Sequence, residues 1–247
     1  MKKSEFVEWN ERMFKKYNNV RLYDHPNPFI RLTERMRAAE AVRSVAGNGR
    51  VLDLGCGEGY MLRQIRARSL VGVDISRTAL LRAAKVSGAV LVRAYAEELP
   101  FQDSYFDAAV CSEVIEHTME PAGIVAELAR VVRPGGKIVI TVPNEPFINR
   151  IKDIVWSVGL AGLLLPGIPR RQNEEWHLHS FDLAMLRRLC GGKLEIASVR
   201  AIPFFLFPVR YVAICTNPKG GPPGAGSLFS RKINKRGPYY DAIGRRK

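Results

Sequence analysis

Two apolar segments of the chain each end in residues suited to binding a nucleoside. The first, Val51–Leu54, leads into a loop with glycine at alternate positions over Gly55–Gly59. Glycine is needed where a backbone turns sharply and comes close to a ligand, because a Cβ atom there would clash. The second, Val71–Val73, ends in Asp74, which is placed to accept hydrogen bonds from a ribose diol. The pattern predicts a nucleoside pocket at the carboxyl edge of a parallel sheet.

The spacing of these glycines indicates which nucleoside is bound. A dinucleotide-binding loop reads G-x-G-x-x-G. This chain reads G-x-G-x-G, and Tyr60 stands where the third glycine of the dinucleotide loop would be. With Asp74 following, the segment resembles motif I and its acid in the class I S-adenosylmethionine (SAM) methyltransferases. The resemblance implies SAM as the cofactor and S-adenosylhomocysteine as its product.

A second region carries the same resemblance. Arg93–Phe101 is similar to the adenine-binding turn of that family, and Ser104–Ser112 is similar to the lead into its fourth strand. The likeness is dense over about residues 48–142. It departs at Tyr95, where the family commonly has an acid that reaches the adenine amino group. Adenine recognition is therefore expected to rest on the backbone at Ala96, with Glu97 or Tyr95 supplying a side chain.

The resemblance also implies roles for the matching residues. Asp53 and the glycine loop hold the methionine end of SAM, Asp74 binds the ribose, and Ile75 covers one face of the adenine. The end of the fourth strand lies beside the reacting sulfonium. The expected cofactor-binding residues are Asp53, Gly55, Cys56, Gly57, Gly59, Asp74, Ile75, Ala96, Glu97, Cys111 and Ser112.

His117 is the candidate for acceptor chemistry. Methyl transfer needs the nucleophile in line with the methyl carbon, about 3 Å away, and a hydroxyl nucleophile must also lose its proton. His117 follows the fourth strand on the side that faces the acceptor in this family, and an imidazole can accept a phenol or hydroxyl proton. The alternative is a histidine that caps a helix or supports a neighbouring group.

A metal site is a further alternative. The string Glu113-x-x-Glu116-His117 resembles the metal-binding Glu-x-x-Glu-His of small-RNA 2′-O-methyltransferases and of some ubiquinone-pathway O-methyltransferases, which add another histidine. Here His179 or its neighbour His177 could supply it, and the set could hold a divalent ion with a substrate diol. The same string occurs in methyltransferases without metal, so the divalent metal is not the favoured prediction.

The elements that position these residues alternate between strands and helices, which predicts a Rossmann-like α/β fold. We expect a seven-stranded, mostly parallel sheet with helices on both faces, N-terminal helices and a helical insertion after strand five. The predicted strands are 50–54, 70–74, 89–93, 107–112, 137–142, 194–200 and 209–216, the last antiparallel. The predicted helices between strands are 59–68, 77–86 and 121–132. The predicted organisation is an N-terminal helical cap (1–46), a methyltransferase domain (47–217) with an acceptor-side insertion (143–192), and a basic flexible tail (218–247).

The insertion contains an uncharged, apolar stretch at 154–169, flanked by basic residues. It is too short, and too often broken by glycine and proline, to span a bilayer. It suits either an element dipping into lipid headgroups or a lid over an apolar substrate. The alternative is a helix buried against the domain.

The charge balance leaves the partner open. The net charge is +14, and residues 218–247 hold eight of the basic residues and one acid. Such a tail could contact nucleic acid or an anionic membrane, or could serve only for solubility. The four cysteines lie far apart, and the first ten residues are polar, so we expect a cytoplasmic protein with reduced thiols, peripheral to the membrane if the 154–169 segment binds lipid.

These observations favour a SAM-dependent methyltransferase that acts on a small-molecule or lipid-like acceptor, most readily at oxygen. The likeness is strongest to the branch that serves ubiquinone and menaquinone biosynthesis. One alternative is an RNA 2′-O-methyltransferase, supported by the basic charge but not by any RNA-binding motif. Another is a non-catalytic SAM-binding protein, which an intact glycine loop and Asp74 argue against.

Overall fold

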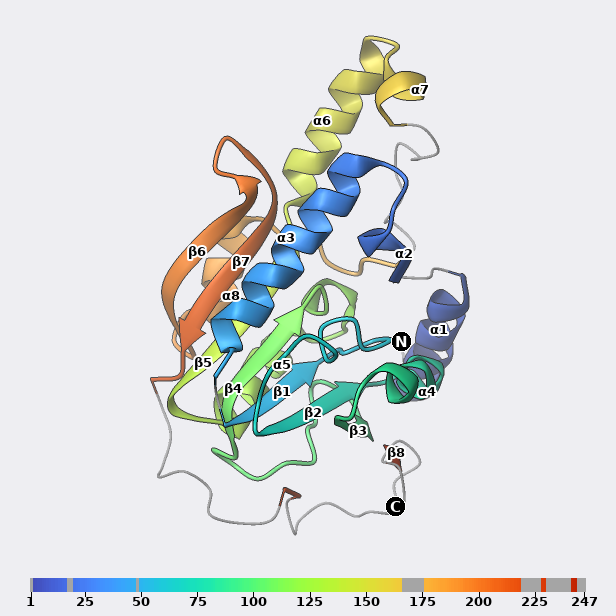
Figure 1. Ribbon diagram of the computed structural model, residues 1–247. Coiled ribbons are helices and arrows are strands. Elements are labelled where there is room, and N and C mark those ends of the chain that lie inside the picture. The colour runs from blue at the N-terminus through green and yellow to red at the C-terminus, as the bar shows by residue number, and fades with distance from the viewer. Residues whose placement is uncertain are drawn as a thin grey trace.

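The computed structural model describes residues 2–16, 20–47, 49–165, 176–218, 228–229 and 241–243. Its centre is an eight-stranded sheet in the order β6-β7-β5-β4-β1-β2-β3-β8 (Figure 1). The strands are β1 (Arg50–Leu54), β2 (Ser69–Asp74), β3 (Val90–Arg93), β4 (Phe106–Ser112), β5 (Val132–Pro143), β6 (Glu195–Phe204), β7 (Phe207–Thr216) and β8 (Asp241–Ile243).

Strands β1 to β5 run parallel, and β7 pairs antiparallel with β5 and with β6. The Rossmann-like fold and all seven strands predicted from the sequence are confirmed. The helices are α1 (Lys3–Lys16), α2 (Val20–Tyr23), α3 (Pro28–Val45), α4 (Arg77–Val86), α5 (Pro121–Val131), α6 (Glu145–Ser157), α7 (Ala161–Leu164) and α8 (Leu183–Cys190), with a 3₁₀ turn, η1 (Ile115–His117).

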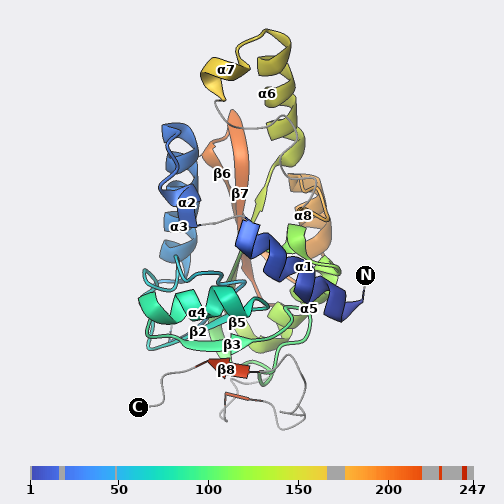
Figure 2. The ribbon, with the colours of Figure 1, turned by 90° about the vertical axis from the view of Figure 1, so that its right-hand side faces the viewer.

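Helices lie on both faces of the sheet (Figure 2), and side chains that alternate along the strands are buried on each face. Leu52 and Leu54 of β1 join a core that includes residues of α5 and α8, whereas Val51 joins a core that includes residues of α3. The register sets Leu54 beside Val73 on one side and beside Cys111 on the other. The carboxyl ends of β2, β1 and β4 therefore lie next to one another, and the loops that follow them share one edge.

The predicted helix at 59–68 is wrong. These residues form successive turns, in which Arg63 N–H donates to Gly59 O at 3.2 Å and Ile65 N–H donates to Met61 O at 3.0 Å. Gly59 has φ +84°, so the chain enters this segment outside the helical region. Met61, Leu62 and Ile65 are nevertheless buried, and their apolar spacing made the segment resemble a helix.

An eighth strand lies in the part of the chain predicted to be a tail. β8 pairs antiparallel with β3, and Phe229 forms an isolated bridge with Phe101. The sequence analysis predicted neither contact. The rest of 219–247 lies outside the described residues, so the flexible tail stays a prediction.

The insertion after β5 projects from the sheet. α6 and α7 extend away from the strands at one end of the molecule, whereas α8 packs on the sheet (Figures 1 and 2). Trp156 and Leu163 have 42% and 76% of their surface exposed. The alternative of a buried helix is therefore wrong for 154–165, and 166–169 lie outside the described residues. Within the described part of the chain, no helix is long and apolar enough to cross a membrane.

Candidate active site and cofactor pocket

A cavity of about 540 Å³ lies at the carboxyl edge of the sheet. The loops after β1 to β4 supply part of its lining, and further lining residues come from α1, α2, α3, α6, β7 and the insertion after β5. The predicted cofactor-binding residues that line it are Gly55, Cys56, Gly57, Asp74, Ile75, Ala96, Glu97 and Ser112. The others do not reach its surface: Asp53 and Cys111 are fully buried in their strands, and Gly59 packs against α4.

The glycine loop is shaped by positive φ angles at its three glycines, of 72°, 50° and 84°. A Cβ on Gly55 would lie 2.2 Å from a methyl carbon of Val114, so the loop after β4 leaves no room for a side chain. The Gly55 N–H donates to Val73 O at 2.8 Å, and this bond fixes the start of the loop to β2. Glycine is thus required by backbone conformation and by close packing together.

Asp74 joins the two loops that surround the predicted ribose position. Its carboxylate accepts hydrogen bonds from Gly57 N–H and Ser76 N–H, both at 2.8 Å. Burial raises the pKa of Asp74 to about 6, although these backbone donors oppose the rise. Each oxygen retains a lone pair, so the side chain can still accept from a diol.

Asp53 lies deeper, near the carboxyl end of β1. It is completely buried, and neither carboxylate oxygen has a hydrogen-bond partner among the described residues. Burial, and next the negative charge of Asp74, raises the pKa of Asp53 to about 7. An ionised carboxylate that is buried without a partner is costly, so burial favours the protonated form of Asp53.

Tyr95 stands where the family commonly has an acid in the adenine-binding turn, and its side chain contacts α1. The Tyr95 hydroxyl donates to the carbonyl oxygen of Lys3 in α1 at 2.8 Å, and its ring stacks on Phe6. Glu97 lines the pocket with Oε1 buried and unpartnered among the described residues, and burial raises its pKa. Of the two side chains predicted to face the adenine, Glu97 is the one with a free acceptor.

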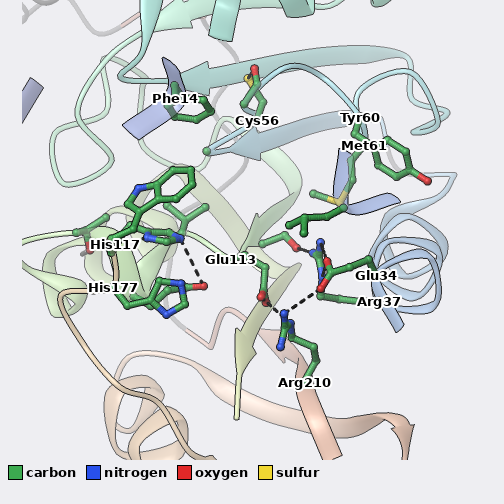
Figure 3. Close-up of a pocket in the computed structure, with 18 of the residues that line it drawn as sticks. Phe14, Glu34, Arg37, Cys56, Tyr60, Met61, Glu113, His117, His177 and Arg210 are labelled. Atoms are coloured by element: carbon green, nitrogen blue, oxygen red, sulfur yellow. Dashed lines mark hydrogen bonds and ion pairs between the residues drawn. The ribbon is translucent and has the colours of Figure 1, made fainter. Parts of the chain in front are cut away.

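A network of buried charges forms the wall next to Ser112 (Figure 3). Glu34 accepts from Arg37 and from Arg210, each at 2.9 Å, and Arg210 also lies 2.9 Å from Glu113. Arg37 reaches Ser112 as well. This network was not predicted from the sequence, because Glu34 and Arg37 have the spacing of an ordinary i,i+3 surface pair and Arg210 is far away in the sequence.

The candidate metal ligands are only partly brought together. Glu113 is occupied by Arg210 and by the Thr141 hydroxyl, which donates to it at 2.9 Å. His179 is turned away, with Nε2 2.9 Å from the carbonyl oxygen of Thr118. The predicted set of Glu113, Glu116, His117 and His179 is therefore wrong in two of its members.

His177 takes the place of His179. Possible ligand atoms of Glu116, His117 and His177 all lie within 4.8 Å of one another. His117 Nδ1 is 3.0 Å from the carbonyl oxygen of Trp176, and His177 Nδ1 contacts the Glu145 carboxylate. The two imidazole rings lie next to each other (Figure 3). Metal-binding histidines usually have one ring nitrogen held in this way. Both oxygens of Glu116 are buried without a hydrogen-bond partner among the described residues, and Oε1 lies 3.9 Å from His117 Nε2.

The environment of His117 changes its expected chemistry. Burial, and next the neighbouring His177, lowers the pKa of His117 to about 3. The imidazole is therefore neutral at physiological pH, as a metal ligand must be. A conjugate acid of such low pKa makes a weak general base, because base catalysis is most effective when the pKa lies near the working pH.

Comparisons with known proteins agree with this geometry. Residues 52–140 match the family described as "Methyltransferase domain". The chain is 37% identical to a ubiquinone biosynthesis O-methyltransferase of Alkalilimnicola ehrlichii over 170 residues, which are 66% of this chain and 67% of the relative. It is 31% identical to the protein of that name from Paracidovorax citrulli, over 66% of this chain and 70% of the relative. The chain belongs to the class I SAM-dependent methyltransferases.

This methyltransferase also shares its fold with distant members. The crystal structure of the N-methyltransferase NodS from Bradyrhizobium japonicum WM9, in complex with S-adenosylhomocysteine, superposes with a TM-score of 0.61 at 17% identity, over 87% of this chain and 99% of NodS. Membership of the family shown by the sequence relatives makes SAM the cofactor and the protein an enzyme. The O-methyltransferase relatives support transfer to oxygen of a small-molecule acceptor.

Proposed function

We propose that this methyltransferase acts on a hydroxyl group of an acceptor with a long apolar tail, which it takes up at an anionic membrane surface. The observation that carries the proposal is the lining of the cavity beyond Ser112 and His117. There the walls become apolar and come from the N-terminal helices, α6, the end of α7 and β7. These apolar lining residues are Leu22, Phe29, Ile30, Ile148, Ile151, Leu165, Phe207 and Val209.

The same elements carry an exposed apolar surface, which we call the apolar tip. Its members lie on α6 and α7, on the turn between β6 and β7, and near the start of α3, at one end of the molecule (Figures 1 and 2). Phe205 and Leu206 in the turn are 84% and 83% exposed. The apolar tip consists of Leu22, Phe29, Leu32, Ile154, Trp156, Val158, Leu160, Leu163, Leu164, Phe204, Phe205 and Leu206.

Leu22 and Phe29 belong to both the cavity lining and the apolar tip. A tail held between α3 and α6 would therefore pass from the pocket to the exposed apolar surface along these two side chains. Contiguous exposed apolar surface on a soluble fold marks a binding surface, and aromatic and aliphatic side chains of this kind insert at the headgroup boundary. Arg150 of α6 is exposed nearby and suits anionic headgroups.

Vesicle sedimentation tests the membrane contact. The wild-type protein should co-sediment with phosphatidylglycerol vesicles, and the double variant Phe205→Ser/Leu206→Ser should lose most of this binding. Leu81→Ser is the matched control, because Leu81 is an exposed leucine on α4, outside the tip. Absence of sedimentation at every salt concentration, or equal binding by the tip variant, would overturn the membrane contact.

A series of 4-alkyl catechols of increasing chain length tests the acceptor. Each methylene buried along the apolar walls contributes about 0.8 kcal/mol, so kcat/KM should rise by up to about fourfold per added carbon until the cavity is filled. Methyl transfer from labelled SAM gives the rate. A kcat/KM that does not change with chain length would exclude the tailed acceptor while leaving the methyltransferase activity itself intact.

Activation of the acceptor hydroxyl is assigned to the cluster of Glu116, His117 and His177. The imidazole of His117 is held by a backbone carbonyl, that of His177 is held by a carboxylate, and the Glu116 carboxylate has no hydrogen-bond partner among the described residues. These three groups fit a divalent cation site better than a general base. When bound, such a cation would lower the pKa of a coordinated hydroxyl. The residues themselves orient the acceptor oxygen and exclude competing water from it.

Treatment with a chelator distinguishes the two candidate roles of His117, as a metal ligand and as a general base. If the cluster holds a cation, chelator should inactivate the enzyme, Mn²⁺ should restore it, and Mn²⁺ binding followed by electron paramagnetic resonance should be lost in Glu116→Gln and His177→Ala. His179→Ala is the control, because His179 stands outside the cluster. If activity survives chelator while His117→Ala slows turnover by about 10²–10⁴-fold, His117 is a general base. Activity that survives both leaves His117 with a structural role only.

A further inference from the structure

One face of α1 lines the cofactor end of the cavity. Phe6, Asn10 and Phe14 recur every four residues, which places them on the same side of the helix. All three are buried and all three line the cavity. Phe6 and Phe14 are aromatic and suit apolar packing, but Asn10 between them carries a polar amide.

The two ends of this face of α1 contact two different parts of the predicted cofactor site. Phe6 packs in a cluster with Tyr95 and Ile75, which belong to the loops of the predicted adenine site. The ring of Phe14 lies 3.8 Å from the position that a Cβ on Gly57 would occupy. The helix therefore runs along the pocket from the adenine loops to the glycine loop, and Asn10 lies between them.

Glu11 ties the middle of α1 to the residues that follow Asp74. Its carboxylate accepts from the Ser76 hydroxyl at 3.0 Å and from Arg77 N–H at 2.6 Å. The neighbouring Asn10 is thereby held near the predicted ribose position. Oδ1 of Asn10 is buried and has no hydrogen-bond partner within the described part of the chain. A buried amide oxygen without a donor is unfavourable unless a ligand supplies one.

We propose that α1 completes the nucleoside half of the cofactor site, and that Asn10 Oδ1 accepts a hydrogen bond from the nucleoside of SAM. The donor is either a ribose hydroxyl or the adenine amino group. The inference depends on the cofactor alone and not on the acceptor proposed above. It also explains Tyr95: the Lys3 carbonyl that its hydroxyl binds lies at the start of α1, so the adenine turn holds the helix that covers it.

Calorimetric titration with S-adenosylhomocysteine tests the role of Asn10. Asn10→Leu keeps the volume but removes the acceptor, and should weaken binding about 3- to 10-fold, the effect of one neutral hydrogen bond. Glu8→Ala, an exposed residue of the same helix, should bind as the wild type does. Unchanged affinity in a folded Asn10→Leu variant would overturn the proposal.

The purine analogue of S-adenosylhomocysteine, in which a hydrogen atom replaces the amino group, identifies the donor. If the amino group is the donor, Asn10→Leu and the wild type should bind this analogue equally; if a ribose hydroxyl is the donor, the difference between them should persist. Hydrogen exchange of the wild type gives a test that needs no variant. S-adenosylhomocysteine should protect the amides of residues 6–14, and unchanged exchange there would also overturn the proposal.

Discussion

Replacing Asp53 by asparagine should make the cofactor-free enzyme more stable at alkaline pH. Asp53 has no accessible surface, and its carboxylate oxygens have no partner among the described residues. Burial and the charge of Asp74 raise its pKa from the ordinary 3.8 to about 7. The folded state therefore holds the proton more tightly than the unfolded state does. This contribution to stability is fully present below about pH 4 and is lost as the pH rises through about 7.

The size of the effect follows from the difference between the two pKa values. Each pH unit of difference corresponds to about 1.36 kcal/mol, so complete ionisation of Asp53 removes about 4 kcal/mol from the free energy of unfolding. Most of that loss falls between pH 5 and pH 8, where it amounts to about 2–3 kcal/mol. The amide introduced by Asp53→Asn does not ionise, so the advantage of this variant over the wild type should grow by that amount across the same interval.

Urea unfolding at pH 5 and pH 8, without cofactor, measures this difference directly. Comparing variant with wild type at each pH cancels the contributions of acids that do not interact with Asp53. Asp103→Asn is the control, because its side chain is 78% exposed and should give the same small difference at both values. If the advantage of Asp53→Asn does not change between pH 5 and pH 8, Asp53 is solvated or paired and the reasoning is wrong.

Two further substitutions test the cofactor loops. Asp74→Ala should weaken SAM binding by about 1.5–3 kcal/mol in calorimetry, because a charged acceptor of the ribose is lost; unchanged affinity would contradict the ribose assignment. Gly55→Ala should destabilise the fold by about 1–3 kcal/mol more than Gly47→Ala in urea unfolding. Both glycines have φ in the left-handed region, +72° at Gly55 and +79° at Gly47, but only at Gly55 would a Cβ meet Val114. Equal losses of stability in the two variants would show that backbone conformation alone requires the glycine.

The sheet could be predicted because its signals are local. β1 and β2 are largely apolar and mostly buried, and the glycines that follow β1 are required by a turn that the neighbouring residues define. The predicted strand 50–54 agrees with β1 at both ends. The error at 59–68 arose from the same kind of signal, because buried apolar residues at helical spacing also fit a series of turns.

The remainder of the site depends on contacts between distant segments. Arg210 comes from β7, yet it pairs with Glu34 of α3 and Glu113 after β4. His177, rather than His179, reaches His117, because the chain between β5 and β6 turns one histidine toward Glu145 and the other toward the Thr118 carbonyl. Residue types and spacing identified both histidines as candidates. Choosing between two histidines that are two residues apart required the path of the insertion.

The buried polar atoms without hydrogen-bond partners indicate which chemical groups the pocket binds. Asn10, Asp53, Glu97 and Glu116 each keep at least one buried oxygen without a hydrogen-bond partner within the described residues. Three of these residues line the cavity, and Asp53 lies near the end of the strand that leads into it. All of these oxygens can accept hydrogen bonds, and three of the residues are acids whose pKa is raised by burial. A folded chain tolerates such atoms where a ligand supplies donors or positive charge. SAM offers both, through its ribose, amino groups and sulfonium, so the unsatisfied acceptors of Asn10 and Glu97 match the chemistry of the cofactor, whereas those of Glu116 match the proposed cation.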